Sequence, residues 1–377
     1  MLSQFYFPVA CSRFKILNPQ AGSTPLFPAI VNRKFMPLPA TEPPEISPVT
    51  DDGRSWPFWS VVIPTYNARP DYLEATLRCV LSQAPGPDAM EILIVDDCSP
   101  QGAPQELVQR VGGGRVQLSS HPKNLGLAGT WNSCINRSRG KWVHILHQDD
   151  LILPGFYETF RRAFAQNQQP GAAYCRHVVI DENGQWGSPS ALERNQPGIL
   201  ENWLARIAVE QVIQTPAIVV KRSVYEEVGG FLPELCYALD WEMWRRIAAR
   251  HPFWYEPGIA ACYRVHGSSA TSRLRHAARD IDDVRRSIDI AAAYLPDDSA
   301  RSLTRKAREF YALWALEYGR DFSSDWDFGP ACAQLCGALR CSASPKVLAQ
   351  AAHYGLRGCW RFLRKLSGLQ KSPPSRK

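Results

Sequence analysis

The sequence predicts an α/β domain built on a mostly parallel central sheet, followed by a helical C-terminal region. Short apolar runs of strand length alternate with segments whose apolar residues recur at helical spacing, which is typical of parallel sheets with helical crossovers. Two of the apolar runs end in paired aspartates, Asp96-Asp97 and Asp149-Asp150. Because open α/β sheets bind ligands beyond the carboxyl ends of their strands, these pairs indicate where a ligand site lies.

The first half of the domain shows the alternation most clearly. The strands are expected at residues 61–63, 91–95, 116–118 and 142–146, the first of them stopped by Pro64. The intervening helices are expected at residues 71–83, 105–111 and 129–136. Asp71 is the expected cap of the first helix.

The pattern loosens after Pro154. A helix over 155–166, a strand over 172–180, a strand running into a helix over 219–225 and a helix over 239–250 are expected there. From about residue 277 the chain is mostly helical, most clearly over 280–294 and 302–318. We therefore divide the chain into a Pro-rich flexible N-terminal extension (1–55), the α/β domain (56–275) and a helical, basic C-terminal region (276–377).

Composition excludes an integral membrane protein and argues against a disulfide framework. The 377 residues are 45% hydrophobic and 21% charged, and no stretch approaches the ~18 consecutive apolar residues of a spanning helix. The eleven cysteines are scattered singly without a CxxC pair, which favours reduced thiols. The first residues lack the apolar core of a secretory signal, so a cytoplasmic location is expected.

The net charge of +7 belongs to the C-terminus, where nine basic and no acidic residues follow Asp327. On a helical wheel, Leu356, Cys359, Trp360, Phe362 and Leu363 face one way and Arg357, Arg361, Arg364 and Lys365 the other. Such a helix suits peripheral contact with the inner face of an anionic membrane. Alternatively, its apolar arc packs against the domain. No nucleic-acid partner is expected, because no RNA-binding fold accompanies the charge.

The two acidic pairs, about 50 residues apart by count along the sequence, could hold the two ends of one ligand. A nucleotide diphosphate needs both hydrogen-bond acceptors and a divalent cation. The pattern therefore favours an enzyme that uses a sugar nucleotide. A dinucleotide-binding domain is disfavoured, because no Gly-rich fingerprint follows the first strand.

Eight motifs, read in order, resemble those of the family 2 glycosyltransferases. They are Ser60-Val-Val-Ile-Pro-Thr-Tyr-Asn67, Glu91-Ile-Leu-Ile-Val-Asp-Asp-Cys-Ser99, Asn124-Leu-Gly126, Leu146-His-Gln-Asp-Asp150, Leu153-Pro-Gly-Phe156, Val228-Gly-Gly-Phe231, Leu239-Asp-Trp-Glu-Met-Trp-Arg245 and Tyr263-Arg-Val-His266. The resemblance covers about residues 58–273. It implies a GT-A fold and transfer of a sugar, with inversion, from a nucleotide diphosphate donor to an acceptor hydroxyl.

The resemblance also assigns roles to individual residues. Nucleotide-binding positions are Pro64, Thr65, Tyr66, Asn67, Asp96, Asp97 and His147. His147 stands where the family's DxD motif has its first Asp, a ribose contact. Asp149 matches the metal-binding Asp and His266 the family's late histidine, so both are candidate ligands of Mg²⁺ or Mn²⁺.

Asp240 matches the family's catalytic base, which removes the proton of the acceptor hydroxyl. Leu239 stands where the family often has Glu, so this like-charge neighbour does not raise the pKa of Asp240 here. A purely structural alternative makes Asp240 the N-cap of its helix. Trp203, Trp241 and Trp244 could stack on sugars, although tryptophans more often belong to the hydrophobic core. Arg264 and Arg273 could contact phosphate.

The sequence therefore predicts a metal-dependent, inverting glycosyltransferase with a nucleotide sugar donor and a glycan or lipid-linked acceptor. Surface polysaccharide or glycolipid synthesis is its expected setting, by analogy with relatives. Two rivals remain, a nucleotidyltransferase on a related sheet and a catalytically inactive family member that serves as a binding or scaffold subunit. His147 and Leu239 are the departures that keep the second rival open.

Overall fold

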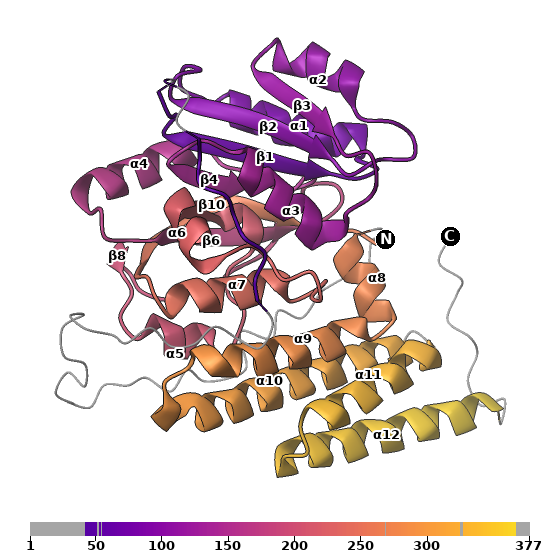
Figure 1. The fold of residues 1–377 in the computed structure, drawn as a ribbon. Coiled ribbons are helices and arrows are strands. Elements are labelled where there is room, and N and C mark those ends of the chain that lie inside the picture. Colours follow the sequence, from indigo (N-terminus) through magenta and orange to yellow (C-terminus); the bar gives the residue numbers. More distant parts are fainter. Residues whose placement is uncertain (1–41, 51–52, 54, 268, 325–326, 367–377) are drawn as a thin grey trace.

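The computed structural model describes residues 42–50, 53, 55–267, 269–324 and 327–366. A ten-stranded sheet with the order β3-β2-β1-β4-β9-β6-β10-β5 forms the centre, with β7 beside β6 and β8 beside β10. Helices cover both faces of the sheet, and α9 to α12 lie together beyond α7 (Figure 1). The expected class, an α/β domain followed by C-terminal helices, is confirmed.

The bounds of the elements are as follows. The strands are β1 (Trp59–Thr65), β2 (Met90–Asp96), β3 (Val116–Ser120), β4 (Trp142–Ile145), β5 (Leu151–Ile152), β6 (Ala172–Ile180), β7 (Trp186–Pro189), β8 (Gly198–Ile199), β9 (Ile218–Lys221) and β10 (Phe253–Arg264). The helices are α1 (Pro70–Leu81), α2 (Gln105–Gly112), α3 (Gly126–Arg137), α4 (Phe156–Gln166), α5 (Trp203–Ile207), α6 (Arg222–Val228), α7 (Leu239–Ala248), α8 (Ala270–His276), α9 (Arg279–Ala291), α10 (Asp297–Ser324), α11 (Phe328–Cys341) and α12 (Pro345–Leu366).

The first four strands form the parallel part of the sheet. β1 pairs in parallel with β2 and β4, and β2 pairs in parallel with β3. Every residue of β1 is buried, as a central strand between helices requires. Pro64 does not stop this strand, which continues to Thr65 opposite Asp96 of β2. The carboxyl ends of β1, β2 and β4 therefore meet at one edge of the sheet.

The second half of the sheet is mixed. β9 joins β4 and β6 through antiparallel ladders, whereas β10 runs parallel to β6 and antiparallel to β5. The long strand β10 was not predicted from the sequence. Pro257-Gly258 interrupts its alternation, and the ladder with β6 shifts register between Glu256 and Ile259 at that point.

The two faces of the sheet pack separate cores. In β1, Val62 belongs to the core under α3 and α7, whereas Val61 and Ile63 belong to the core under α1 and α4. The first core continues without a break into α9 and α10, through residues such as Ile281 and Ala312. The C-terminal helices therefore share their core with the sheet.

Helix α7 is buried on almost every side because it lies between the sheet and α9 (Figure 1). Even its charged residues are inside: Glu242 and Arg246 form an ion pair of 2.6 Å with side chains at most 1% exposed. Arg246 also donates to the carbonyl oxygens of Val228 and Gly230, and Tyr294 donates to Glu242. Each buried charge thus has a partner, as burial demands.

Part of the expected flexible extension packs against the domain. Ile46 is 1% exposed and belongs to the core under α7. The carbonyl oxygen of Pro44 accepts the N–H of Gly230, and that of Ser47 accepts a hydrogen bond from Arg222. The segment 42–50 of the expected extension thus contacts the domain, whereas residues 1–41, 51–52 and 54 lie outside the described residues.

The basic C-terminal segment forms the end of α12, but its side chains from Arg357 onward lie outside the described part of the structure. The proposed division of that helix into basic and apolar arcs thus stays a prediction. Within the described residues, no helix is long and apolar enough to cross a membrane. The cysteines described there, including buried Cys134, Cys175 and Cys262, are free thiols.

Candidate active site

The ends of β1 and β2 form a tightly bonded corner. Thr65 Oγ1 donates to Asp96 Oδ1 at 3.2 Å, and Ser99 donates to both carboxylate oxygens of Asp96 through its N–H and hydroxyl. The Ser99 hydroxyl in turn accepts the N–H of Asn67, whose φ is +48°. Asp96 is 1% exposed, so this corner fixes the backbone at the expected nucleotide site.

Asp97 differs from Asp96 in what it holds. Its two carboxylate oxygens accept the N–H groups of Leu125 and Gly126, at 2.7 and 3.0 Å. These groups stand at the start of α3, where no helical partner is available for them. Asp97 therefore anchors α3 beside the corner, a structural use that the sequence did not distinguish from ligand binding.

Tyr66 is the predicted nucleotide residue whose ring is open to solvent, with 43% of its surface exposed, whereas Pro64 and Thr65 are buried in β1. Its backbone pairs with a side chain from the loop after β4: Gln148 Oε1 accepts the N–H of Tyr66, and Gln148 Nε2 donates to its carbonyl oxygen. Gln148 thereby joins the two halves of the site. Sequence reasoning missed it, because it occupies the variable middle position of the His-Gln-Asp motif.

Asp149 and Asp150 follow β4 and have different environments. The side chain of Asp149 is 20% exposed, and its Oδ2 lies 2.9 Å from Nε2 of His266. The side chain of Asp150 is 1% exposed, accepts the N–H of Arg264 and lies 3.3 Å from Nδ1 of His147. Asp149 is thus the accessible carboxylate, and Asp150 supports the loop from beneath.

Arg264 binds the backbone of the loop that contains Asp149. Its Nε donates to the carbonyl oxygen of Asp149, and its Nη1 donates to that of Asp181. Because the guanidinium already binds two carbonyl groups and is almost fully buried, the predicted phosphate contact does not fit Arg264. Arg273 is exposed on α8.

Among the described residues, His147, Asp149 and Asp150 form a group whose potential ligand atoms all lie within 4.8 Å of one another. His147 Nε2 is buried without a hydrogen-bond partner, which is costly unless something else binds it. Two carboxylates and an imidazole fit a divalent cation such as Mn²⁺. The sequence predicted Asp149 and His266 as the metal residues; the structure brings His147 into the same group and leaves His266 as a contact of Asp149.

Asp240 lies in the first turn of α7, two residues after the N-cap Ala238, so the alternative that Asp240 caps the helix is wrong. Its Oδ2 accepts a hydrogen bond from Gln211 Nε2 at 2.9 Å, and its Oδ1 accepts the N–H of Trp241. Burial raises the pKa of Asp240 to about 6, although these hydrogen bonds and the nearby His147 oppose the increase. Burial thus supplies the effect expected from the like-charge neighbour that Leu239 replaces.

His147 links the two parts of the site electrostatically. Burial disfavours its protonation, but the hydrogen bond to Asp150 and the charges of Asp150, Asp149 and Asp240 outweigh burial and raise the pKa of His147. His147 and Asp240 each shift the pKa of the other, so Asp240 lies within electrostatic range of the group His147, Asp149 and Asp150. The aromatic candidates are not in the site: Trp203, Trp241 and Trp244 are at most 6% exposed and belong to the core.

The family follows from a comparison of this chain with known proteins. Residues 60–229 match the family model described as glycosyl transferase family 2. The segment 60–229 belongs to this family. The matched segment contains the corner at Asp96 and the loop at Asp149, while Asp240 and His266 lie beyond its end.

Two relatives of this glycosyltransferase and one solved structure extend the comparison. An uncharacterized glycosyltransferase of Haemophilus influenzae is 23% identical over 267 residues, which cover 67% of this chain and 88% of that protein. The putative teichuronic acid biosynthesis glycosyltransferase TuaG of Bacillus subtilis is 38% identical over 96 residues, 25% of this chain and 36% of TuaG. S. aureus TarS 1-349 in complex with UDP-GlcNAc superposes with a TM-score of 0.60 at 15% identity, over 80% of this chain and 88% of the chain in that structure. The structural likeness supports the GT-A fold.

Proposed function

We propose that this family 2 glycosyltransferase transfers a sugar, with inversion and with a divalent cation, from a nucleotide diphosphate sugar to an acceptor hydroxyl. The observation that carries the proposal is the position of Asp240. It is a largely buried carboxylate with a raised pKa that lies within electrostatic reach of the cluster His147, Asp149 and Asp150. A base beside a cation site is what attack on a diphosphate-linked sugar requires.

The nucleoside binds at the corner of β1 and β2 in this proposal. Tyr66 offers an exposed ring on which a base can stack, and Asn67 is exposed beside it. Asp96 keeps free lone pairs for a ring N–H or a ribose hydroxyl, although Thr65 and Ser99 already bind it. Asp97 contributes to nucleoside binding less directly than Asp96, because it fixes the start of α3.

The cation is held by Asp149 together with His147, and Asp150 orients His147 from below. His266 orients Asp149 through their hydrogen bond. A bound cation supplies charge neutralisation on the diphosphate leaving group. The imidazole at the position of the family's first Asp favours Mn²⁺ over Mg²⁺, because Mg²⁺ prefers oxygen ligands.

Asp240 accepts the proton of the acceptor hydroxyl as that oxygen attacks the anomeric carbon. The new oxygen–carbon bond forms as the bond from the anomeric carbon to the diphosphate oxygen breaks. The nucleoside diphosphate leaves with the bonding electrons, and attack from the opposite side inverts the anomeric centre. Gln211 holds Asp240 ionised and oriented for this step.

The acceptor is a glycan or a lipid-linked glycan in this proposal, as part of surface polysaccharide or glycolipid synthesis. The support is the similarity to TuaG, whose name assigns it to teichuronic acid biosynthesis. A cytoplasmic enzyme that reaches the inner face of the membrane through its basic C-terminal helix would meet such an acceptor. The charge of the last 50 residues, nine basic and none acidic, supports this placement.

Thermal stabilisation by donors tests the proposed function directly. The protein is melted with UDP-, GDP- and dTDP-sugars, each with Mn²⁺, Mg²⁺ or chelator. A donor at about 100 times its Kd adds about 2.7 kcal/mol to the free energy of unfolding, so one nucleotide class should raise Tm and do so best with Mn²⁺. The Asp149→Asn variant should lose the Mn²⁺-dependent part of the shift.

Product analysis separates the rivals. Release of a nucleoside diphosphate indicates a glycosyltransferase, whereas release of pyrophosphate from a nucleoside triphosphate would indicate a nucleotidyltransferase. If no nucleotide sugar changes Tm with any metal, the proposed function is wrong.

A further inference from the structure

The N-terminus of α7, the helix that carries Asp240, is held by a residue of another helix. Its N-cap Ala238 has no side chain that could bind a free N–H. Instead Asp283 of α9 accepts the N–H groups of three consecutive residues: Cys236 at 3.1 Å, Tyr237 at 2.7 Å and Ala238 at 2.8 Å. One buried carboxylate therefore fixes the backbone that leads into the turn of Asp240.

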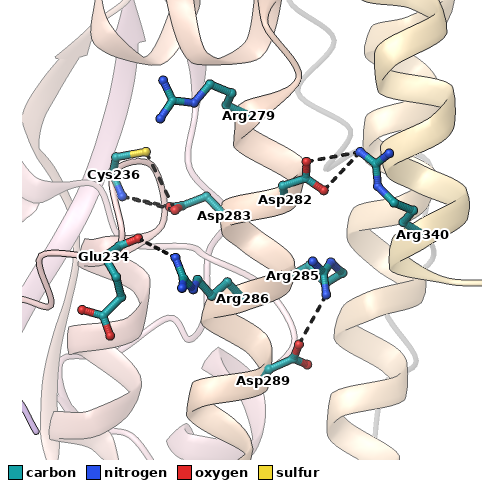
Figure 2. A pocket seen from close by; sticks show the side chains of 9 residues that line it. All are labelled: Glu234, Cys236, Arg279, Asp282, Asp283, Arg285, Arg286, Asp289 and Arg340. Atoms are coloured by element: carbon teal, nitrogen blue, oxygen red, sulfur yellow. Dashed lines mark hydrogen bonds and ion pairs between the residues drawn. The ribbon is translucent and has the colours of Figure 1, made fainter. Parts of the chain in front are cut away.

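Figure 2 shows how specific this contact is. Asp282 and Asp283 are neighbours on α9, beside a polar cleft of about 700 Å³. Asp283 points toward Cys236, whereas Asp282 points the other way and pairs with Arg340 of α11. Asp283 is 8% exposed, while the side chain of Asp282 is 47% exposed. Asp282 thus offers a matched comparison with the same chemistry and no contact to α7.

A second route leads from α10 to the carboxylate itself. The hydroxyl of Tyr311 accepts the N–H of Gln211 at 2.9 Å. The side chain of Gln211 donates to Asp240 Oδ2 at 2.9 Å, and the Tyr311 ring lies 4.8 Å from that of Trp241. Tyr311 is 5% exposed, so water does not compete freely for its hydroxyl. The residue that orients Asp240 is therefore held by a helix far along the chain.

We propose that Asp283 and Tyr311 are positioning residues for Asp240, so that the C-terminal helices α9 and α10 complete the active site. This inference rests on the proposed function, and both residues lie outside the segment that matches the family. Asp283 fixes where α7 begins, and Tyr311 fixes the amide that orients the carboxylate. A displacement of about 1 Å in a reacting group costs up to about a hundredfold in rate, so loss of either contact lowers turnover.

The experiment compares two variants with two matched controls in the full-length protein. Tyr311→Phe removes one hydroxyl, and Asp283→Asn leaves one acceptor oxygen where there were two. The controls are Tyr354→Phe and Asp282→Asn. Tyr354 of α12 donates its hydroxyl to Glu317 of α10, and Asp282 pairs with Arg340. The probe is the Mn²⁺-dependent release of nucleoside diphosphate from the sugar nucleotide that stabilises the wild type, with kcat and donor KM measured separately and Tm recorded.

Both test variants should lose about tenfold in kcat while donor KM stays at the wild-type value. Asp283→Ala, which removes both acceptors, should lose more than Asp283→Asn, and both controls should keep the wild-type kcat. If Tyr311→Phe and Asp283→Asn turn over as fast as their controls, the inference is wrong although the proposed function stands. A wild type that releases no nucleoside diphosphate from any sugar nucleotide would overturn the function and the inference together. Should Asp283→Asn fold poorly, Tyr311→Phe decides alone.

Discussion

At the scale of single residues, three of the candidate aspartates have three different environments. Asp97 is saturated by backbone N–H groups, Asp149 is accessible beside His266, and Asp240 is mostly buried with one amide donor. Burial raises the pKa of the Asp240 carboxyl group to about 6, whereas Asp97, which is 4% exposed, is held by two backbone N–H groups. A group with that pKa is ionised near neutral pH and still basic enough to accept a proton.

The pKa of Asp240 predicts how turnover depends on pH. The ionised form is the base, so kcat should rise with pH through about 6 and level off above 7. At pH 5 only about a tenth of the sites are ionised, and kcat should fall to about a tenth of its plateau. The measurement is kcat under saturating donor from pH 5 to pH 8, with donor KM followed alongside. A flat profile, or one that rises toward acid, would contradict the role of Asp240.

The candidate site residues could be predicted from the sequence, but the residues that hold them in place could not. The candidacy of Asp240 as the base and of Asp149 as a metal ligand followed from the resemblance of the motifs alone. The partners Gln211, Asp283 and Tyr311 did not, because each is separated from Asp240 by 29 residues or more and none has a local pattern. Gln148 was equally hidden, since its contact with Tyr66 spans 82 residues.

At the scale of elements, α7 is the element on which the site depends. Its first turn carries Asp240, and its buried ion pair Glu242–Arg246 ties it to the loop at Val228 and Gly230 and to Tyr294. The helical period predicted α7, but not that its charged residues are buried. A helix whose every face is buried takes its partners from distant elements, which periodicity does not reveal.

The buried pair predicts a large and local stability effect. Glu242→Gln removes a charge and leaves Arg246 buried and uncompensated, so the free energy of unfolding should fall by about 3–5 kcal/mol. Glu74→Gln is the surface control, because Glu74 pairs with Arg78 at i,i+4 and also with Arg110 of α2, both at 2.7 Å and with both arginines exposed. That change should cost at most about 1 kcal/mol. Urea unfolding of both variants measures the two changes in the free energy of unfolding. Equal losses would mean that the buried pair stabilises the protein no more than the exposed pair does.

The strands show the same division between local and distant information. The parallel strands β1, β2, β3 and β4 were predicted because short, mostly apolar segments alternate there with helical patterns. β10 was not, because Pro257-Gly258 breaks its pattern and only pairing with β6 makes the segment a strand. The stretch at 42–50 looked like a linker by composition, yet Ile46 is buried against the domain.

At the scale of the whole molecule, the packing is continuous across residue 275, the boundary expected from the sequence. The core under α7 runs from the sheet into α9 and α10. Asp283 of α9 binds the backbone just before the turn that carries Asp240, and Tyr311 of α10 binds Gln211, whose side chain donates to Asp240. We therefore expect the GT-A domain and the first C-terminal helices to act as one unit. The proposed membrane role belongs to the end of α12 and is independent of this unit.

The central claim is that Asp240 is the base of a metal-dependent sugar transfer. The most direct test is single-turnover kinetics of Asp240→Asn with the stabilising sugar nucleotide and Mn²⁺, together with the donor Kd. The account predicts a loss of at least about a hundredfold in the rate of nucleoside diphosphate release with an unchanged Kd. Since burial raises the pKa of Asp240 to about 6, its ionisation lowers the free energy of unfolding fully above pH 6 and not at all below about pH 4. The neutral variant should therefore melt at the wild-type temperature or higher at pH 7.5. A variant that binds donor and turns over at the wild-type rate would contradict the account.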